Sequence, residues 1–217
     1  MCRRIRNDES FCLICNKDIT NEKSIENIIQ KPIICKECRD QFVKVNKIYK
    51  KNIDWIVLYE YNEFLERLLF RYKEQRDVEL APVFFYLYVD RLKELSKKYT
   101  ICTMCSDDEH RLKRGFEPVN KMLEYHGILV YSPLYKQKNM KQSSMHKNQR
   151  QEIKKYIHRK EMYPLPLNKP ILLIDDVLTT GNTLERGIEL LKPAKVMVLC
   201  ANPLWIKENS MAKQKRF

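Results

Sequence analysis

The residues best suited to ligand chemistry lie in one run near the carboxyl end of the chain, from Ile171 to Thr183. The run reads Ile-Leu-Leu-Ile-Asp-Asp-Val-Leu-Thr-Thr-Gly-Asn-Thr, so an apolar stretch leads to two carboxylates and then to hydroxyl groups around a glycine. Helical spacing follows, and a helix N-terminus attracts anions because it carries partial positive charge. The sequence therefore predicts a loop that cradles one phosphate.

Two adjacent carboxylates, Asp175 and Asp176, precede this loop. They would repel a phosphate at the same spot, so we expect them one step away, where they accept hydrogen bonds from two sugar hydroxyls. A phosphate at one end and a diol at the other describe ribose 5-phosphate. A phosphorylated ribose is therefore the expected ligand.

Two other phosphate motifs use similar residues. A P-loop requires G-x-x-x-x-G-K-[ST], which is absent, and a Rossmann loop requires three closely spaced glycines, whereas only Gly181 and Gly187 occur here. Adjacent aspartates also occur in simple magnesium sites or at the ends of ordinary strands. The full run is more specific than any pair within it, which favours a phosphorylated ribose.

The segments around the motif predict a βαβ unit. The continuous apolar run from Ile171 is typical of a strand buried on both faces of a parallel sheet. Its two aspartates fall at the carboxyl end, where open α/β sheets bind ligands. A helix is expected over 184–191 and a further strand over 196–201.

Upstream, hydrophobic periodicity predicts further alternating elements. Strands are expected over 55–61, 101–105 and 128–131, and helices over 64–72, 82–97 and 119–123. A charged loop is expected over 107–116, where Gly115 marks a position at which a side chain is unwelcome. The 217 residues suffice for one main domain with a small appendage, which we divide into a 1–50 module and a 51–217 domain.

Four cysteines form two C-x-x-C pairs with 19 residues between them: Cys12 and Cys15, then Cys35 and Cys38. This spacing is typical of a four-thiolate zinc site, and four thiolates leave no position for water, so the zinc is predicted to be structural. Metal binding would supply folding free energy that so short a module cannot gain from its core. A redox dithiol is the alternative, although it needs only one such pair.

The remaining cysteines carry weaker signals. Cys102 and Cys105 form another C-x-x-C pair without a partner pair nearby. Buried strand thiols are expected at Cys102 and Cys200, with a second metal or redox site as the alternative. Cys2 lies at the terminus. The charged N-terminus is not followed by an apolar core, which argues against an export signal and predicts reduced thiols in the cytoplasm.

The charge balance favours a polyanionic partner. Lys and Arg number 41 against 28 Asp and Glu, a formal net charge of +13, and no apolar stretch reaches the roughly 20 residues of a membrane-spanning helix. Between Lys136 and Lys160 there are nine Lys or Arg residues and one acid. Such a segment is either a solvated loop or a phosphate contact, with Tyr131, Tyr135 and Tyr156 available to stack on the bases of single-stranded DNA.

The run from Ile171 to Thr183 resembles the phosphoribosyl pyrophosphate signature of type I phosphoribosyltransferases. The resemblance implies that the two aspartates hold the ribose hydroxyls and that a magnesium ion accompanies the pyrophosphate. It places seven residues around the ligand and its 5-phosphate: Val177, Leu178, Thr179, Thr180, Gly181, Asn182 and Thr183.

The whole chain is similar to the bacterial competence protein ComF family, in which a cysteine-knuckle zinc module precedes a phosphoribosyltransferase-like domain. The 111–116 loop, the 141–150 segment and the 64–72 helix also match. The resemblance implies an α/β fold with a parallel sheet flanked by helices after a four-cysteine module. It further implies a cytoplasmic role in natural transformation, handling single-stranded DNA with a helicase-like partner at the inner face of the membrane.

Catalysis stays open at this point. In a transferase, basic side chains stabilise the departing pyrophosphate, and Arg111, Arg114 and Lys141 are the candidates. The sequence identifies neither an acceptor pocket nor a general base. We expect an accessory protein of DNA uptake that retains a phosphoribosyl site; the alternatives are an active phosphoribosyltransferase of nucleotide metabolism or salvage, and a scaffold whose zinc module docks a protein partner.

Overall fold

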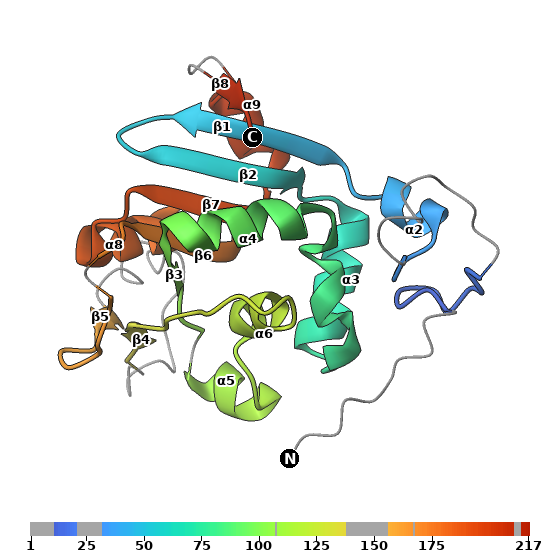
Figure 1. Ribbon diagram of the computed structural model, residues 1–217, viewed down its shortest axis with the longest axis horizontal. Helices are drawn as coiled ribbons and strands as arrows, with labels where there is room; N and C mark the ends of the chain where they lie inside the picture. Colours follow the sequence, from blue (N-terminus) through green and yellow to red (C-terminus); the bar gives the residue numbers. More distant parts are fainter. Residues whose placement is uncertain (1–10, 21–31, 107, 138–155, 167, 211–213) are drawn as a thin grey trace, which may run out of the picture.

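The computed structural model describes residues 11–20, 32–106, 108–137, 156–166, 168–210 and 214–217. Their centre is a six-stranded sheet with the order β3-β6-β7-β2-β1-β8 (Figure 1). Its strands are β1 (Lys44–Lys50), β2 (Asp54–Glu60), β3 (Thr100–Thr103), β6 (Ile171–Leu178), β7 (Lys195–Ala201) and β8 (Gln214–Arg216). β3, β6, β7 and β2 are parallel, whereas β1 and β8 add antiparallel at one edge. The expected α/β class is confirmed.

Helices cover both faces of the sheet. They are α2 (Lys36–Asp40), α3 (Glu63–Lys73), α4 (Val89–Lys98), α5 (Asp108–Arg114), α6 (Pro118–Glu124), α8 (Asn182–Leu191) and α9 (Pro203–Glu208), with 3₁₀ turns η1 (Val78–Val83) and η2 (Tyr86–Tyr88). Residues of α2, α3, α4 and α6 share one core, and α8 and α9 contribute to the other. A small hairpin of β4 (Leu134–Lys136) and β5 (Ile157–Arg159) packs beside α8.

The central strands are apolar on both sides because both faces are covered. In β7, Met197 and Leu199 belong to the core that contains α3 and α4, while Val196 and Val198 belong to the core that contains α8 and α9. β6 has the same character up to Ile174, after which Asp175 and Asp176 interrupt the apolar run. Its polar residues are therefore held by a rigid, buried strand.

α3 connects several parts of the molecule. It begins at Asn62, whose Oδ1 accepts a hydrogen bond from Leu65 N at 2.9 Å and so caps the first turn. Its apolar stripe is buried as far as Tyr72, whose hydroxyl donates to Pro118 O at 2.9 Å. The last turn of α3 is thus fixed by packing and by a buried hydrogen bond.

The chain differs from expectation at three of the predicted elements. The single helix expected over 82–97 is wrong over its first half, where η1 and η2 precede α4. The backbone leaves the α-helical conformation at Phe85 (φ −106°, ψ 7°) and Tyr88 (φ −127°, ψ 12°). The loop expected over 107–116 contains α5, which ends before Gly115 at φ +82°. The strand expected over 128–131 is only an isolated bridge between Cys102 and Tyr131.

The N-terminal segment joins the sheet earlier than its predicted boundary. Residues 44–50, assigned from sequence to the cysteine module, form β1 and pair with β2. The division into a 1–50 module and a 51–217 domain stays a prediction. Within the described ranges, no helix combines the length and apolar character needed to cross a membrane.

Candidate functional site

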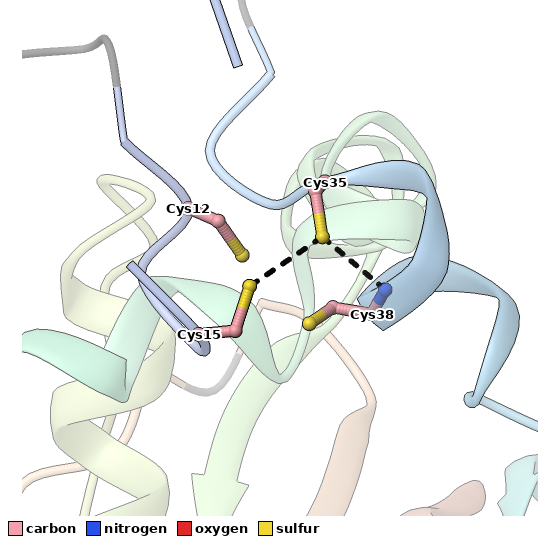
Figure 2. A group of neighbouring side chains, drawn as sticks. All are labelled: Cys12, Cys15, Cys35 and Cys38. Carbon is pink, nitrogen blue, oxygen red and sulfur yellow. Dashed lines mark hydrogen bonds between the residues drawn. The ribbon is translucent and has the colours of Figure 1, made fainter. Parts of the chain in front are cut away.

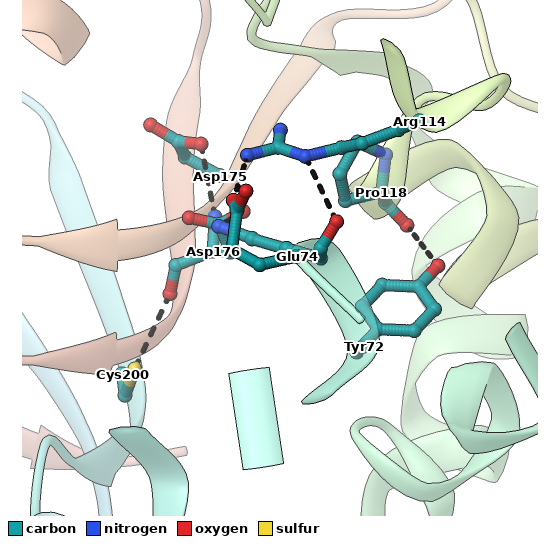
Figure 3. Close-up of polar contacts among 8 residues, drawn as sticks. Tyr72, Glu74, Arg114, Pro118, Asp175, Asp176 and Cys200 are labelled. Atoms are coloured by element: carbon teal, nitrogen blue, oxygen red, sulfur yellow. Dashed lines mark hydrogen bonds and ion pairs between the residues drawn. The ribbon is translucent and has the colours of Figure 1, made fainter. Parts of the chain in front are cut away.

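β6 brings two carboxylates to the carboxyl-end edge of the parallel sheet. Asp175 and Asp176 lie within β6, which continues through Val177 and Leu178. Asp175 Oδ1 accepts a hydrogen bond from Asp176 N at 2.9 Å, and Cys200 Sγ on β7 donates to Asp176 O at 3.5 Å (Figure 3). Both aspartates are partly buried, and the side chain of Asp176 is only 15% exposed.

Asp176 is paired with a lysine that the sequence did not single out. Lys73 Nζ lies 2.5 Å from Asp176 Oδ2, and the two side chains are only 20% and 15% exposed. Burial opposes the charge of Lys73, but the carboxylates of Asp176 and Asp175 outweigh it and raise the pKa of Lys73. The lysine is therefore a cation at neutral pH.

The surroundings of Asp175 oppose the ionisation of its carboxyl group. Burial, followed by the charge of Asp176, raises the pKa of Asp175 to about 7, although the hydrogen bond from Asp176 N and the charge of Lys73 act in the opposite direction. A carboxyl group that exchanges its proton near neutrality is typical of functional sites. The charge of the pair can thus change when a ligand or cation arrives.

Arg114, one of three cations expected to face a pyrophosphate, lies against the last turn of α3. Its Nη2 pairs with Glu74 Oε1 (Figure 3). Its Nε donates to Lys73 O at 3.1 Å, and its side chain is 12% exposed. These contacts fix the guanidinium beside α3. In this structure its visible role is to hold the turn that carries Lys73.

Of the other two expected cations, the structure describes only Arg111. Arg111 is 48% exposed, and its Nε lies 3.8 Å from Glu117 Oε1. Lys141 lies outside the described residues. The roles of these side chains toward a pyrophosphate stay predictions.

The expected phosphate loop lies between β6 and α8. Gly181 caps the helix with φ +87°, a backbone conformation that favours glycine. Thr179 and Thr180 are exposed, while Asn182 and Thr183 open the helix and are half-buried. Backbone amides and hydroxyls are therefore gathered at the start of a ten-residue helix.

Buried apolar residues pack against this loop at Gly181. A Cβ at Gly181 would lie 3.5 Å from Leu178 Cδ1 and 4.0 Å from Trp55 Cη2. Leu178 is 1% exposed, and its carbonyl accepts a hydrogen bond from Asn202 N. Leu178 thus serves the loop by packing, whereas the residues that follow it present polar groups to solvent.

The four N-terminal cysteines converge as their spacing indicates (Figure 2). Their sulfurs all lie within 4.8 Å of one another, and Cys15 Sγ is 3.6 Å from Cys35 Sγ. Cys35 also caps α2, where its Sγ accepts from Cys38 N at 3.4 Å. In a tetrahedral zinc site with Zn–S bonds of about 2.3 Å the sulfurs are about 3.8 Å apart, so the cluster fits a zinc ion.

The environment of the sulfurs supports the same interpretation. Burial and the neighbouring thiols raise the pKa of the Cys38 thiol well above its usual range. Four thiolates at this separation need a cation among them, and a closed set of four sulfurs suits a structural ion. Elsewhere in the described part of the chain, no other set of three or more metal-binding side chains gathers in this way. Cys102 and Cys200 are buried strand thiols, as expected.

The cysteine cluster is tied directly to α3. Arg71 Nη1 donates to Ile14 O, inside the first knuckle, at 2.8 Å, and Arg71 Nη2 pairs with Asp77 at 2.8 Å. Asn62 Nδ2, at the start of α3, donates to Gln41 O after α2. The helix that carries Lys73 is therefore held against the cysteine module at both ends.

Comparison with known protein families identifies the class of domain that contains the site. Residues 134–213 match the phosphoribosyl transferase domain family, and this region contains β6, the loop and α8. The site geometry and the family match thus agree on a phosphoribosyltransferase domain.

One similar protein matches most of the chain. The chain is 28% identical over 194 residues to competence protein ComFC of Streptococcus pneumoniae. The aligned region covers 88% of this chain and 85% of that protein. The chain is therefore ComFC-like and carries a phosphoribosyltransferase domain, and the resemblance inferred from the sequence is confirmed.

The raised pKa of Asp175 predicts a stability effect with a defined sign. Its folded pKa of about 7 lies above the unfolded value of about 4, so the stability contributed by Asp175 is fully present below pH 4 and is lost as pH rises toward 7. Asp175→Asn keeps the acceptor oxygen for Asp176 N but removes the charge. We expect this variant to be more stable than wild type at pH 8, by on the order of a few kcal/mol, in urea unfolding.

Asp54 provides a control of opposite sign. Burial opposes its ionisation, yet Lys195 and Lys50 outweigh burial and hold the pKa of Asp54 below its usual range. Asp54→Asn should therefore be less stable than wild type at pH 8. A gap between Asp175→Asn and wild type that does not close toward pH 4 would contradict the assignment.

Substitution within the cysteine cluster should remove its metal. We expect Cys12→Ser to lower bound zinc well below one ion per chain and to reduce the stability of the N-terminal segment, because a tetrahedral site loses a ligand. Elemental analysis of purified protein measures the metal, and Cys105→Ser is the matched control outside the cluster. Full zinc content in Cys12→Ser would refute the four-cysteine assignment.

Proposed function

We propose that this protein binds phosphoribosyl pyrophosphate at the carboxyl-end edge of its parallel sheet. The observation that carries the proposal is the joint presence of the Asp175–Asp176 pair and the Gly181 loop on β6 and α8. The loop suits the 5-phosphate because its amides open a helix, and the carboxylates suit ribose hydroxyls because they are fixed acceptors. The phosphoribosyl transferase domain match supports a ligand of this class.

Charge is the main constraint on such a ligand. A pyrophosphate brings several negative charges close to two carboxylates, and a bound magnesium ion would supply compensating charge on its oxygens. Lys73 already offsets Asp176, and Asp175, with its pKa of about 7, is protonated about half of the time at pH 7. The site can therefore accept an anionic sugar with less repulsion than two free carboxylates would cause.

The biological setting follows from the ComFC-like character of the chain. We assign it to natural competence as an accessory protein of DNA uptake with a structural zinc module over 1–50 and a phosphoribosyltransferase-like domain over 51–217. A helicase-like partner and a cytoplasmic location at the inner face of the membrane belong to the same proposal. Transfer of the phosphoribosyl group to an acceptor is the alternative function, for which the described residues identify no acceptor pocket.

Replacement of both carboxylates tests the ligand site. We expect Asp175→Asn/Asp176→Asn to lose at least tenfold in affinity for phosphoribosyl pyrophosphate with magnesium, since two acceptors for the ribose hydroxyls are weakened. Isothermal titration calorimetry measures the affinity, and Asp54→Asn, at the opposite end of the parallel strands, is the control. Equal affinities of wild type and the double variant would sink the assignment.

A second candidate function, contact with single-stranded DNA, rests on the β4–β5 hairpin. Tyr135 and His158 face each other across the strands with ring centroids 5.5 Å apart, and Tyr135 is 38% exposed. Arg159 and Lys160 follow on the exposed end of β5. Aromatic rings beside cations suit stacked bases and a phosphate backbone. The intervening residues 138–155, which hold much of the basic segment, lie outside the described residues.

Salt dependence tests this contact. We expect Arg159→Gln/Lys160→Gln to reduce the slope of log affinity against log salt by about 0.7 for each lost phosphate contact on a single strand. Fluorescence anisotropy with a labelled oligonucleotide at several salt concentrations measures the slope. Lys97→Gln/Lys98→Gln, at the end of α4, removes the same charge elsewhere. An equal slope change in both double variants would show that the hairpin makes no specific contribution.

A further inference from the structure

Lys73 is a cation on α3 that contacts the carboxylate site on β6, about a hundred residues further along the chain. It is the last residue of α3, and its Nζ contacts Asp176 Oδ2 at 2.5 Å with both side chains largely buried. The apolar stripe of α3 ends one residue earlier, at Tyr72. A buried ammonium is costly without a partner, so this lysine is held for its charge and not for packing alone.

The surroundings of Lys73 fix where its ammonium lies. Tyr72 is anchored to Pro118 O, and Arg114 Nε binds the carbonyl of Lys73 itself. Arg114 is in turn paired with Glu74. The backbone of the turn is therefore held on both sides of Lys73, and its side chain reaches the carboxylates from a rigid base.

The charged and titratable groups around the pair come from several elements. Arg114 faces Lys73 from α5 and lowers its proton affinity, while Asp175 acts in the opposite sense. Tyr61, after β2, and Cys200, on β7, also lie close enough to Asp176 to feel its charge. Both of these groups are neutral at pH 7 because burial raises their pKa values further. Lys73 is thus the cation that the structure places in an ion pair with Asp176.

We propose that Lys73 is a positioning residue for the phosphoribosyl site, holding Oδ2 of Asp176 so that Oδ1 is left to accept a ribose hydroxyl. Its charge also offsets one carboxylate as the anionic ligand enters. This inference rests on the proposed function, and it assigns to α3 a role that the phosphoribosyl motif itself does not contain. Arg114 acts behind it by fixing the turn.

Calorimetry with phosphoribosyl pyrophosphate and magnesium tests this role. Lys73→Met should lose roughly ten- to hundredfold in affinity, the effect of a lost charge-assisted hydrogen bond. Lys73→Arg should recover most of it, and Lys98→Met, on the exposed end of α4, should match wild type. Equal affinities of wild type and Lys73→Met overturn the inference while leaving the ligand site in place.

A double-mutant cycle separates positioning from a general loss of structure. If Lys73 acts through Asp176, adding Lys73→Met to Asp176→Asn should cost no further affinity, because the partner is already neutral. This double variant also avoids an unpaired buried carboxylate, so it should fold even where Lys73→Met does not. Additive losses would overturn the inference.

Carboxyl NMR of the ligand-free protein gives an independent readout. Removal of a nearby positive charge should move the titration midpoint of Asp175 to higher pH in Lys73→Met, but not in Lys98→Met. An unmoved midpoint overturns the electrostatic role. Absence of any binding by wild-type protein would instead refute the proposed function, and with it the role of Lys73 toward that ligand.

Discussion

The candidate site depends on the ion pair between Lys73 and Asp176. Two neighbouring carboxylates at the end of a buried strand repel each other and lose hydration, and each effect favours protonation. One of the two, Asp175, shows this as a pKa raised to about 7, whereas Asp176 is met by an ammonium at 2.5 Å. The two acids therefore lie in different environments. Asp176 is held by its ion pair with Lys73, whereas the neighbouring Asp175 exchanges its proton near neutral pH.

The same turn of α3 carries contacts in three directions. Arg71 reaches the first cysteine knuckle, Tyr72 reaches α6, and Lys73 reaches β6. Successive residues on a helix point to different sides, so a single turn can join parts that are far apart in sequence. The cysteine module is consequently more than an appendage, because its first knuckle packs against the helix that supplies the counter-charge of the site.

Local patterns were sufficient to predict the motif and the cysteine cluster. The run through Asp175 and Asp176 and the spacing of the C-x-x-C pairs each place all their functional atoms within a short segment or two. The parallel strands were predictable for the same reason, since continuous apolar runs reflect burial on both faces. The α/β class followed from these runs and their intervening helices.

Contacts between distant segments were not predictable in this way. Lys73 looks like an ordinary basic residue at a helix C-terminus, where cations are common, and nothing nearby in the sequence indicates its partner on β6. Arg114 is held beside α3 by Glu74 and a backbone carbonyl, contacts that the sequence did not indicate, and its role toward a pyrophosphate stays a prediction. The turns η1 and η2 replaced the first half of an expected helix because tertiary packing of buried residues such as Phe84 and Phe85 outweighed the periodic pattern.

The most direct measurement of the central claim is an NMR titration of zinc-loaded protein with phosphoribosyl pyrophosphate and magnesium, following side-chain carboxyl and backbone amide signals. The account predicts that the carboxyl signals of Asp175 and Asp176 shift together with the amides of Thr180, Gly181 and Asn182, at one common affinity. Shifts confined to basic residues of the surface, with the two carboxyl signals unmoved, would contradict it.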